Sequence, residues 1–303
     1  MILVTGGAGF IGSHTVEALL AAGERVRVLD DLSAGRRDNL PADPELEVLE
    51  GDIRDPAVVA QAMQGVSKVL HLAAQVSVVR SVEEPVASGA VNLGGFLVVL
   101  DAARRAGVER FVYASSAAVY GMPDRVPVDE SSPVRPRSPY GLEKVVGDQY
   151  AGLFRDLYGV RSLSLRYFNV YGPRQDAASP YAGVISKFLD CARAGRALRV
   201  FGDGKQTRDF IFVRDVARIN LAALGTAAEG ICNVGTGHST SVLELIGLLE
   251  QICARRLAVS HEPPRLGDIR HSATSVARLR EVVGEMQFTG LREGLEEMWK
   301  SGT

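Results

Sequence analysis

Residues 2–12, Ile-Leu-Val-Thr-Gly-Gly-Ala-Gly-Phe-Ile-Gly, decide how the N-terminal half of this chain folds. Their apolar and β-branched start predicts a short buried strand, and Gly6, Gly9 and Gly12 follow at a spacing of three. Residues 13–22 continue as an amphipathic helix. Glycines between a strand and a helix permit a tight turn, and they let a pyrophosphate approach the N–H groups of the helix N-terminus. The stretch therefore predicts a dinucleotide site on a parallel α/β sheet.

An acidic pair follows the next predicted strand. Asp30 ends the apolar run 26–29, and Asp31 comes directly after it. A carboxylate at this place accepts hydrogen bonds from the adenosine ribose hydroxyls and repels a 2′-phosphate, which favours NAD over NADP. Arg36 and Arg37 argue the other way, because a guanidinium can hold a phosphate, although a solvated loop also accounts for both.

Length and composition bound the remaining possibilities. The chain has 303 residues, of which 46% are hydrophobic and 23% charged, with a formal net charge of −2. These values are ordinary for a globular protein of one large or two modest domains. They exclude disorder, collagen and coiled coil, and they offer no electrostatic reason to bind nucleic acid or an anionic membrane.

The cysteines and the apolar runs indicate a cytoplasmic protein. Cys191, Cys232 and Cys253 are odd in number and lack C-x-x-C spacing, so we expect neither structural disulfides nor a thiolate metal site. The five histidines show no metal-ligand spacing, so no metal is expected. We also expect no membrane-spanning helix and no signal peptide, because no run approaches 18 apolar residues and the first strand begins at Ile2.

Strand and helix patterns alternate over the first 170 residues, which predicts a doubly wound parallel sheet of the Rossmann type. After Tyr171 the rhythm changes, which predicts a smaller C-terminal α/β domain that shapes a substrate site. We expect a nucleotide-binding domain over 1–170, onto which 208–236 packs back, and a substrate domain over 171–303. The runs expected as strands are 2–5, 26–29, 47–49, 69–73, 110–114, 162–166 and 198–201, and the helical patterns are 13–22, 58–63, 91–106, 140–158, 184–194 and 242–255.

Residues 138–144, Ser-Pro-Tyr-Gly-Leu-Glu-Lys, form the second decisive motif. Ser138 and Pro139 are typical of an N-cap and a first helical residue, so Tyr140 and Lys144 fall on one helical face. A free phenol has a pKa near ~10 and is a poor base at neutral pH. A neighbouring ammonium, the helix N-terminus and a cationic nicotinamide would each favour the phenolate.

A tyrosine and a lysine four residues apart are common on exposed helices. The pair therefore indicates a catalytic site only together with the sequence around it. Residues 113–121, Tyr-Ala-Ser-Ser-Ala-Ala-Val-Tyr-Gly, precede it and end a predicted strand. Their serines, Ser115 and Ser116, therefore lie at the sheet edge where open α/β sheets bind ligands. We predict Tyr140, Lys144 and Ser116 as the catalytic residues.

In these motifs the chain resembles the extended short-chain dehydrogenase/reductases. Within them it is most similar to the NAD-dependent nucleotide-sugar epimerases of the UDP-glucose 4-epimerase type. The resemblance covers essentially the whole chain, and it implies NAD as cofactor, a UDP-sugar as substrate, and a homodimer formed through the helices 91–106 and 140–158. The matching segments are 5–12, 30–35, 51–55, 71–75, Asn92, 115–121, 140–144, 166–172, 208–209 and 265–268.

The resemblance also implies roles for individual residues. Ser116 would hydrogen-bond the sugar 4-oxygen and relay its proton to Tyr140, and Lys144 would hold the nicotinamide ribose. The implied cofactor-binding residues are Gly6, Gly9, Phe10, Ile11, Gly12, Asp30, Asp31, Ser33, Gly35, Asp52, Ile53, Leu72, Ala73, Ala74, Gln75, Asn92, Ser115, Tyr140, Lys144, Tyr167 and Val170. The implied substrate-binding residues are Ser116, Ala117, Tyr140, Asn169, Val184, Arg199, Val200, Phe201, Arg208, Arg265, Asp268 and Ser272.

Three features separate reaction types and substrates within the family. The similar 4,6-dehydratases carry Asp and Glu just after the active Ser or Thr, whereas this chain has Ala117 and Ala118. Epimerisation through a 4-keto sugar is therefore the expected reaction, with a dehydratase or decarboxylase as the alternative. A glucuronate 4-epimerase is a further alternative, which the acid-bearing loop 174–181 disfavours. In the similar epimerases the position of Ser272 bounds the pocket around the C2 substituent of the sugar, and a large Tyr there closes it. The resemblance therefore implies that UDP-GlcNAc and UDP-GalNAc are accepted beside UDP-glucose and UDP-galactose.

Overall fold

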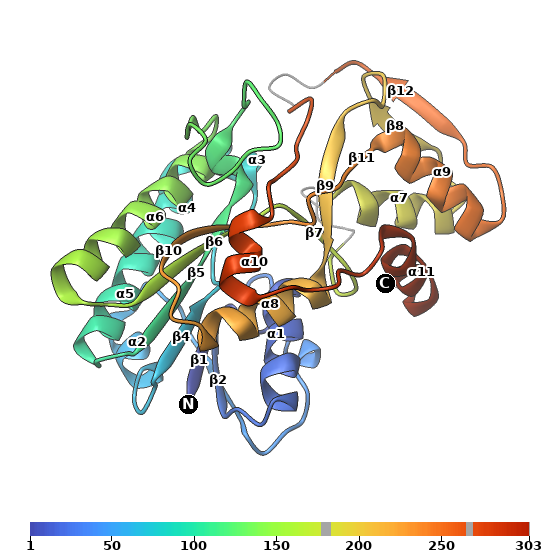
Figure 1. Ribbon diagram of the computed structural model, residues 1–303. Coiled ribbons are helices and arrows are strands. Elements are labelled where there is room, and N and C mark those ends of the chain that lie inside the picture. Colours follow the sequence, from blue (N-terminus) through green and yellow to red (C-terminus); the bar gives the residue numbers. More distant parts are fainter. Residues whose placement is uncertain (177–182, 265–268, 303) are drawn as a thin grey trace.

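The computed structural model describes residues 1–176, 183–264 and 269–302. At its centre lies a parallel sheet of seven strands in the order β10-β6-β5-β4-β1-β2-β3 (Figure 1). The order reverses between β1 and β4, which creates the crevice where doubly wound sheets bind nucleotides. The strands of this sheet are β1 (Ile2–Thr5), β2 (Val26–Asp30), β3 (Leu46–Glu50), β4 (Lys68–His71), β5 (Arg110–Ser116), β6 (Ser162–Tyr167) and β10 (Gly230–Val234).

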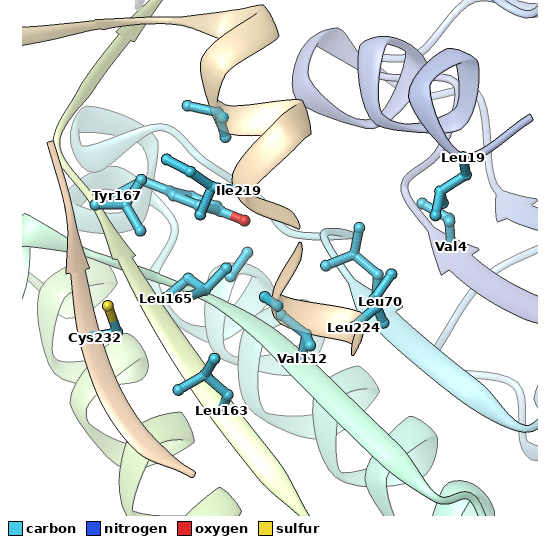
Figure 2. Packing of buried hydrophobic residues seen from close by; sticks show 14 of the residues in the cluster. Val4, Leu19, Leu70, Val112, Leu163, Leu165, Tyr167, Ile219, Leu224 and Cys232 are labelled. Atoms are coloured by element: carbon cyan, nitrogen blue, oxygen red, sulfur yellow. The ribbon is translucent and has the colours of Figure 1, made fainter. Parts of the chain in front are cut away.

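Helices cover both faces of this sheet, as the alternating pattern predicted. Successive side chains of a strand point to opposite faces, so Val4 and Val112 enter one core while Leu3 and Phe111 enter the other. Figure 2 shows the first core, in which Ile219 and Leu224 of α8 pack over the strands. The helices of this face are α1 (Phe10–Ala21), α8 (Val213–Gly225) and α10 (Ala277–Val283), and those of the other face are α2 (Pro56–Ala62), α5 (Phe96–Arg105) and α6 (Pro139–Tyr158).

The helix expected over 91–106 differs from the one observed. The chain turns helical at Pro85 and passes through a π-helical segment, η2 (Ala90–Gly95), before α5 begins. The continuous helical stretch Pro85–Arg105 has 21 residues and is long and apolar enough to cross a membrane, whereas we expected no such segment from the sequence. Phe96, Val99, Leu100 and Ala103 of this stretch are buried against the sheet. A core helix of a soluble protein has the same length and composition, so the feature is weak grounds for a membrane span.

A smaller lobe stands beside the carboxyl ends of the strands (Figure 1). It contains a three-stranded sheet in the order β11-β9-β7 and a parallel pair, β12-β8. Its core gathers Phe188, Phe212, Leu245 and Leu249. The elements are β7 (Asn169–Tyr171), α7 (Val184–Arg193), β8 (Leu198–Phe201), β9 (Thr207–Phe212), β11 (Ser239–Ser241), α9 (Val242–Cys253), β12 (Val259–Glu262) and α11 (Leu291–Ser301).

The chain returns from this lobe to the large sheet between residues 213 and 234. Sequence periodicity predicts no bounds for elements in this region, yet α8 lies on the sheet beside α1 and β10 pairs with β6 at its edge. Long-range packing therefore decides this part of the fold. The remaining short helices are η1 (Arg37–Asn39), α3 (Val78–Glu83), α4 (Pro85–Gly89) and η3 (Ala117–Tyr120).

Candidate active site

The three glycines after β1 build a cradle that side chains would fill. Gly6 has φ +70°, and a Cβ there would lie 2.7 Å from the main-chain nitrogen of Ala73. A Cβ on Gly12 would lie 2.1 Å from the carbonyl oxygen of Gly6. Gly9 caps the N-terminus of α1, where Phe10 and Ile11 begin the first turn. This cradle accepts a pyrophosphate at the positive end of the α1 dipole, so the residues present fit a dinucleotide.

Asp30 is fixed at the end of β2 by the main chain. Its two carboxylate oxygens accept N–H groups from Ala8 at 2.8 Å and Leu32 at 2.9 Å. Burial raises the pKa of Asp30, and these two hydrogen bonds oppose the rise. Each oxygen keeps a further lone pair, which fits the ribose hydroxyls of a dinucleotide.

The loop that follows β2 is shaped around the cradle. The exposed Asp31 accepts hydrogen bonds from the N–H and hydroxyl of Ser33. A Cβ on Gly35 would lie 2.8 Å from the carbonyl carbon of Ala8, so only glycine lets this loop pass so close to the cradle. Residue 35 must therefore be glycine because of this close packing, and not because the backbone adopts a positive φ.

The residues expected at the adenine lie after β3. The carboxylate of Asp52 pairs with the guanidinium of Arg54, which lowers the pKa of Asp52. Ile53 is buried, and a Cβ on Gly95 would lie 2.6 Å from its Cδ1. The small residue in the π-helical segment thus makes room for Ile53.

The end of β4 is tied to β1 and to the π-helical segment. Thr5 Oγ1 lies 2.8 Å from His71 Nδ1 and accepts the N–H of Ala73 at 3.3 Å. Asn92 Oδ1 accepts the N–H of Gln75 at 2.8 Å, and Asn92 Nδ2 donates to its carbonyl at 2.9 Å. This double hydrogen bond fixes the half-buried run Leu72, Ala73, Ala74 and Gln75 beside the cradle.

Helix α6 and strand β5 bring the predicted catalytic side chains together. The Ser138 hydroxyl accepts the N–H of Gly141 at 3.1 Å and so caps α6, as its sequence predicts. Lys144 Nζ donates to the carbonyl of Ala114 at 2.7 Å and lies 5.7 Å from the ring centroid of Tyr140. Ser116 is the last residue of β5, and its hydroxyl acts on the phenol of Tyr140 by lowering its pKa.

Burial governs the electrostatics of this pair. Burial raises the pKa of Tyr140 to about 12, and the carboxylate of Glu143 adds to the rise while Ser116 opposes it. Burial also lowers the pKa of Lys144 to about 8, against the attraction of Asp148 and Glu143. Loss of hydration therefore dominates the pKa of Tyr140 in the protein without a cofactor, and the expected help to the phenolate from the ammonium, the helix terminus and a cationic nicotinamide stays a prediction.

A cleft of about 200 Å³ opens beside Ser116, between the sheet edge and the small lobe. Five of the residues expected at the substrate line it: Ser116, Ala117, Asn169, Arg208 and Ser272. Tyr167, expected at the cofactor, lines it as well, while its hydroxyl donates to Asn220 Oδ1 at 2.6 Å.

Other residues expected at the substrate or cofactor lie elsewhere. The side chain of Val200, expected at the substrate, is buried in the core of the small lobe. Val184 packs partly against the same core at the start of α7. Arg199 lies over the ring of Phe201 at 5.8 Å, away from the cleft lining. Val170 and Ser115 lie beside the cleft-lining strand ends, and Arg265 and Asp268 fall outside the described residues.

Two buried carboxylates near the site, Asp148 and Glu143, were not predicted from the sequence. Asp148 accepts a hydrogen bond from Arg166 Nε at 2.9 Å, and the same guanidinium donates to the hydroxyl of Tyr120 at 2.9 Å. Glu143 accepts hydrogen bonds from Ser88 and Asn92. The spacing of Asp148, four residues after Lys144 on one helical face, is a feature that could have revealed it.

The cradle, the sheet order and the Ser116–Tyr140–Lys144 group are together typical of a dinucleotide-dependent enzyme. The model of the NAD dependent epimerase/dehydratase family matches residues 2–235, and the chain belongs to this family. The family, the doubly wound fold and the dependence of the family on NAD, all expected from the motifs, are thereby confirmed.

Curated and solved relatives cover nearly the whole chain. The UDP-glucose 4-epimerase of Mycolicibacterium smegmatis is 42% identical over 97% of this chain and 95% of its own. The solved UDP-N-acetylglucosamine 4-epimerase of Methanobrevibacter ruminantium, in complex with UDP-N-acetylmuramic acid, has a TM-score of 0.96 at 34% identity, covering 99% of this chain and 98% of its own. The UDP-glucose 4-epimerase of Thermus thermophilus, in complex with NAD, has a TM-score of 0.91 at 39% identity, covering 99% and 97%.

Proposed function

We propose that this protein is an NAD-dependent isomerase that interconverts UDP-hexoses differing at C4. The observation that carries the proposal is that Ser116 lines the cleft at the end of β5, the strand to which Lys144 is bound through the carbonyl of Ala114, while Tyr140 lies next to Lys144 on α6. Ala117 and Ala118 line the same wall and carry no acid for an elimination, which favours epimerisation over dehydration. The epimerase relatives described above support the same reaction.

The side chains around the cleft suit a nucleoside diphosphate sugar. Arg208 and Asn169 offer a guanidinium and an amide to a diphosphate at the side formed by the small lobe. The small apolar residues Ala117 and Ala118 leave room for the hexose at the opposite side, next to Ser116. The sugar is then held chiefly by its diphosphate, which allows either face of C4 to be presented.

The residues of the chain divide the chemistry among them. Tyr140 takes the proton from the sugar O4 and later returns it, with the hydroxyl of Ser116 as relay. Lys144 is fixed by the carbonyl of Ala114 and keeps donors for the nicotinamide ribose. The glycine cradle and Lys144 would hold NAD, which would supply a reversible hydride acceptor for C4 and so would be unchanged over a full cycle.

Ser272 favours a broad choice of sugar. It is half-buried on the wall of the cleft, and its small side chain leaves space for an N-acetyl group. We therefore include the UDP-GlcNAc and UDP-GalNAc pair with UDP-glucose and UDP-galactose.

We also propose that the protein forms a homodimer and acts in the cytoplasm. Exposed apolar side chains gather on α6, where Leu142, Leu153 and Leu157 are 54%, 51% and 67% exposed. Val82 and Val86 of the neighbouring α3 and α4 are also exposed. A second copy of the chain would cover this face through the helices 91–106 and 140–158.

The decisive experiment incubates the purified protein with NAD and either UDP-GlcNAc or UDP-glucose, and follows the anomeric proton signals by NMR. UDP-GalNAc and UDP-galactose are the expected products. UDP-galactose alone would keep the reaction and refute the role of Ser272. An unchanged spectrum with both substrates would refute the proposed function, and UDP-glucuronate would be the next substrate.

A further inference from the structure

Glu143 is a buried carboxylate within the catalytic motif that the mechanism above does not use. It lies between Tyr140 and Lys144 on α6 and is 5% exposed. A carboxylate so removed from water needs hydrogen-bond partners. Its Oε2 accepts the hydroxyl of Ser88 at 2.9 Å and Nδ2 of Asn92 at 2.6 Å.

These contacts place Glu143 in a closed path of hydrogen bonds around the site. Asn92 holds both main-chain groups of Gln75, and the side-chain amide of Gln75 donates to the carbonyl of Ser77 at 3.2 Å. The Ser77 hydroxyl caps α3, and Ser81 of that helix accepts the N–H of Tyr140 at 3.1 Å. The path therefore runs from α6 to the end of β4 and back to the first turn of α6.

The negative charge of Glu143 is not neutralised by its hydrogen-bond donors, because the hydroxyl of Ser88 and the amide of Asn92 are both uncharged. Asp148, the other carboxylate of α6 near Lys144, is paired with Arg166 at 2.9 Å. The remaining groups that face the ammonium are His71 from β4, whose pKa is lowered to about 3, and Tyr113 from β5, whose pKa is raised, so both are neutral at neutral pH. The negative charge of Glu143 raises the pKa of both Tyr140 and Lys144.

We infer that Glu143 is a positioning residue that holds Asn92, and through it the main chain of Gln75, and that it places a negative charge beside the Tyr140–Lys144 pair. The inference rests on the proposed function for its kinetic consequence. The positioning role of Glu143 concerns only the cofactor side of the site, because Gln75 is the last residue of the run 72–75, which borders the glycine cradle.

Two substitutions separate the two roles. Glu143→Gln keeps an oxygen that can accept from Ser88 and Asn92 but removes the charge, whereas Glu143→Ala removes both. Loss of a nearby negative charge favours the phenolate and the neutral amine. We expect Glu143→Gln to move both limbs of the pH–rate profile to lower pH by about 0.5 to 1 unit, with KM changed less than about threefold. We expect Glu143→Ala to weaken NAD binding about tenfold, because the amide of Asn92 loses a buried acceptor.

Readouts besides activity make the test independent of turnover. Ionisation of Tyr140 is followed by ultraviolet difference spectra, after subtraction of the same titration of Tyr140→Phe, and NAD affinity is measured by calorimetry. Glu83→Gln, which removes an exposed charge from α3, is the matched control and should change neither quantity. Thermal unfolding establishes that each variant is folded, and Glu143→Gln alone suffices if Glu143→Ala does not fold.

A phenol titration of Glu143→Gln that superimposes on that of the wild type would overturn the electrostatic role. NAD affinity within twofold of the wild type for a folded Glu143→Ala would overturn the positioning role. A wild-type protein that converts no UDP-sugar refutes the proposed function instead, and the titration and the NAD affinity then still decide the role of Glu143.

Discussion

Lys144 Nζ donates to the carbonyl oxygen of Ala114 at 2.7 Å, which couples α6 to β5 two residues before that strand ends at Ser116. The same strand end supplies Ser116, and the same helix supplies Tyr140. The contact holds the ammonium 4.9 Å from the ring centroid of Tyr113 and leaves two of its three N–H groups for a ligand. One junction between a strand and a helix thus sets the relative placement of all three proposed catalytic side chains.

Replacement of Tyr140 by Phe should abolish turnover without unfolding the protein. The substitution removes the hydroxyl that exchanges the O4 proton and keeps the ring. We expect the rate of epimerisation to fall by about 10²- to 10⁴-fold, measured by NMR with saturating NAD. Tyr150→Phe, on the same helix, is the control and should retain the wild-type rate. A Tyr140→Phe enzyme that keeps a tenth of the activity would remove Tyr140 from the mechanism.

The stability of the fold should fall in mild acid because of His71. Burial and the charge of Lys144 lower its pKa to about 3, below the ordinary value of 6.5 that holds in the unfolded chain. Between these pH values the unfolded chain binds more protons, so the free energy of unfolding decreases as the pH falls from 6.5 towards 3. This one group contributes at most about 1.4 kcal/mol per pH unit.

Urea denaturation at pH 7 and pH 5 measures this dependence. His71→Asn should flatten it, whereas His238→Asn, at an exposed position, should leave it unchanged. Equal slopes for the wild type and His71→Asn would show that other groups carry the acid sensitivity.

A bulky side chain at residue 272 should narrow the choice of sugar. In Ser272→Tyr the ring would occupy the part of the cleft proposed for the N-acetyl group. We expect kcat/KM for UDP-GlcNAc to fall by at least about tenfold, with that for UDP-glucose changed only slightly. Ser272→Ala, which keeps the space, should act on both sugars as the wild type does. Equal losses on both sugars in Ser272→Tyr would argue for a general distortion of the cleft.

A charge on the apolar face of α6 should separate the proposed dimer. Leu157 is 67% exposed, so Leu157→Glu costs the folded monomer little but buries a carboxylate in the interface. We expect sedimentation to show a shift from dimer to monomer. Leu243→Glu, on the exposed side of α9 in the small lobe, should remain dimeric. A wild-type protein that sediments as a monomer would refute the dimer itself.

The features that the sequence determined are the local ones. The glycine cradle, the Ser138 cap and the i, i+4 placement of Tyr140 and Lys144 follow from backbone geometry over a few residues, so they could be read without knowledge of the fold. Strands β1, β2 and β4 of the large sheet were also predictable, because their burial on both faces goes with short, mostly apolar runs.

Only the tertiary structure decided the rest, since it depends on residues far apart in the chain. The expected strand over 69–73 ends at His71, where Asn92 and Thr5 take over the hydrogen bonds of the main chain. Val200 is buried because it joins the core of the small lobe, and Glu143 meets Ser88 and Asn92 only after helices pack on the sheet. The pKa of Tyr140 rises for the same reason, because loss of hydration is a property of the packed site and not of the motif that carries the phenol.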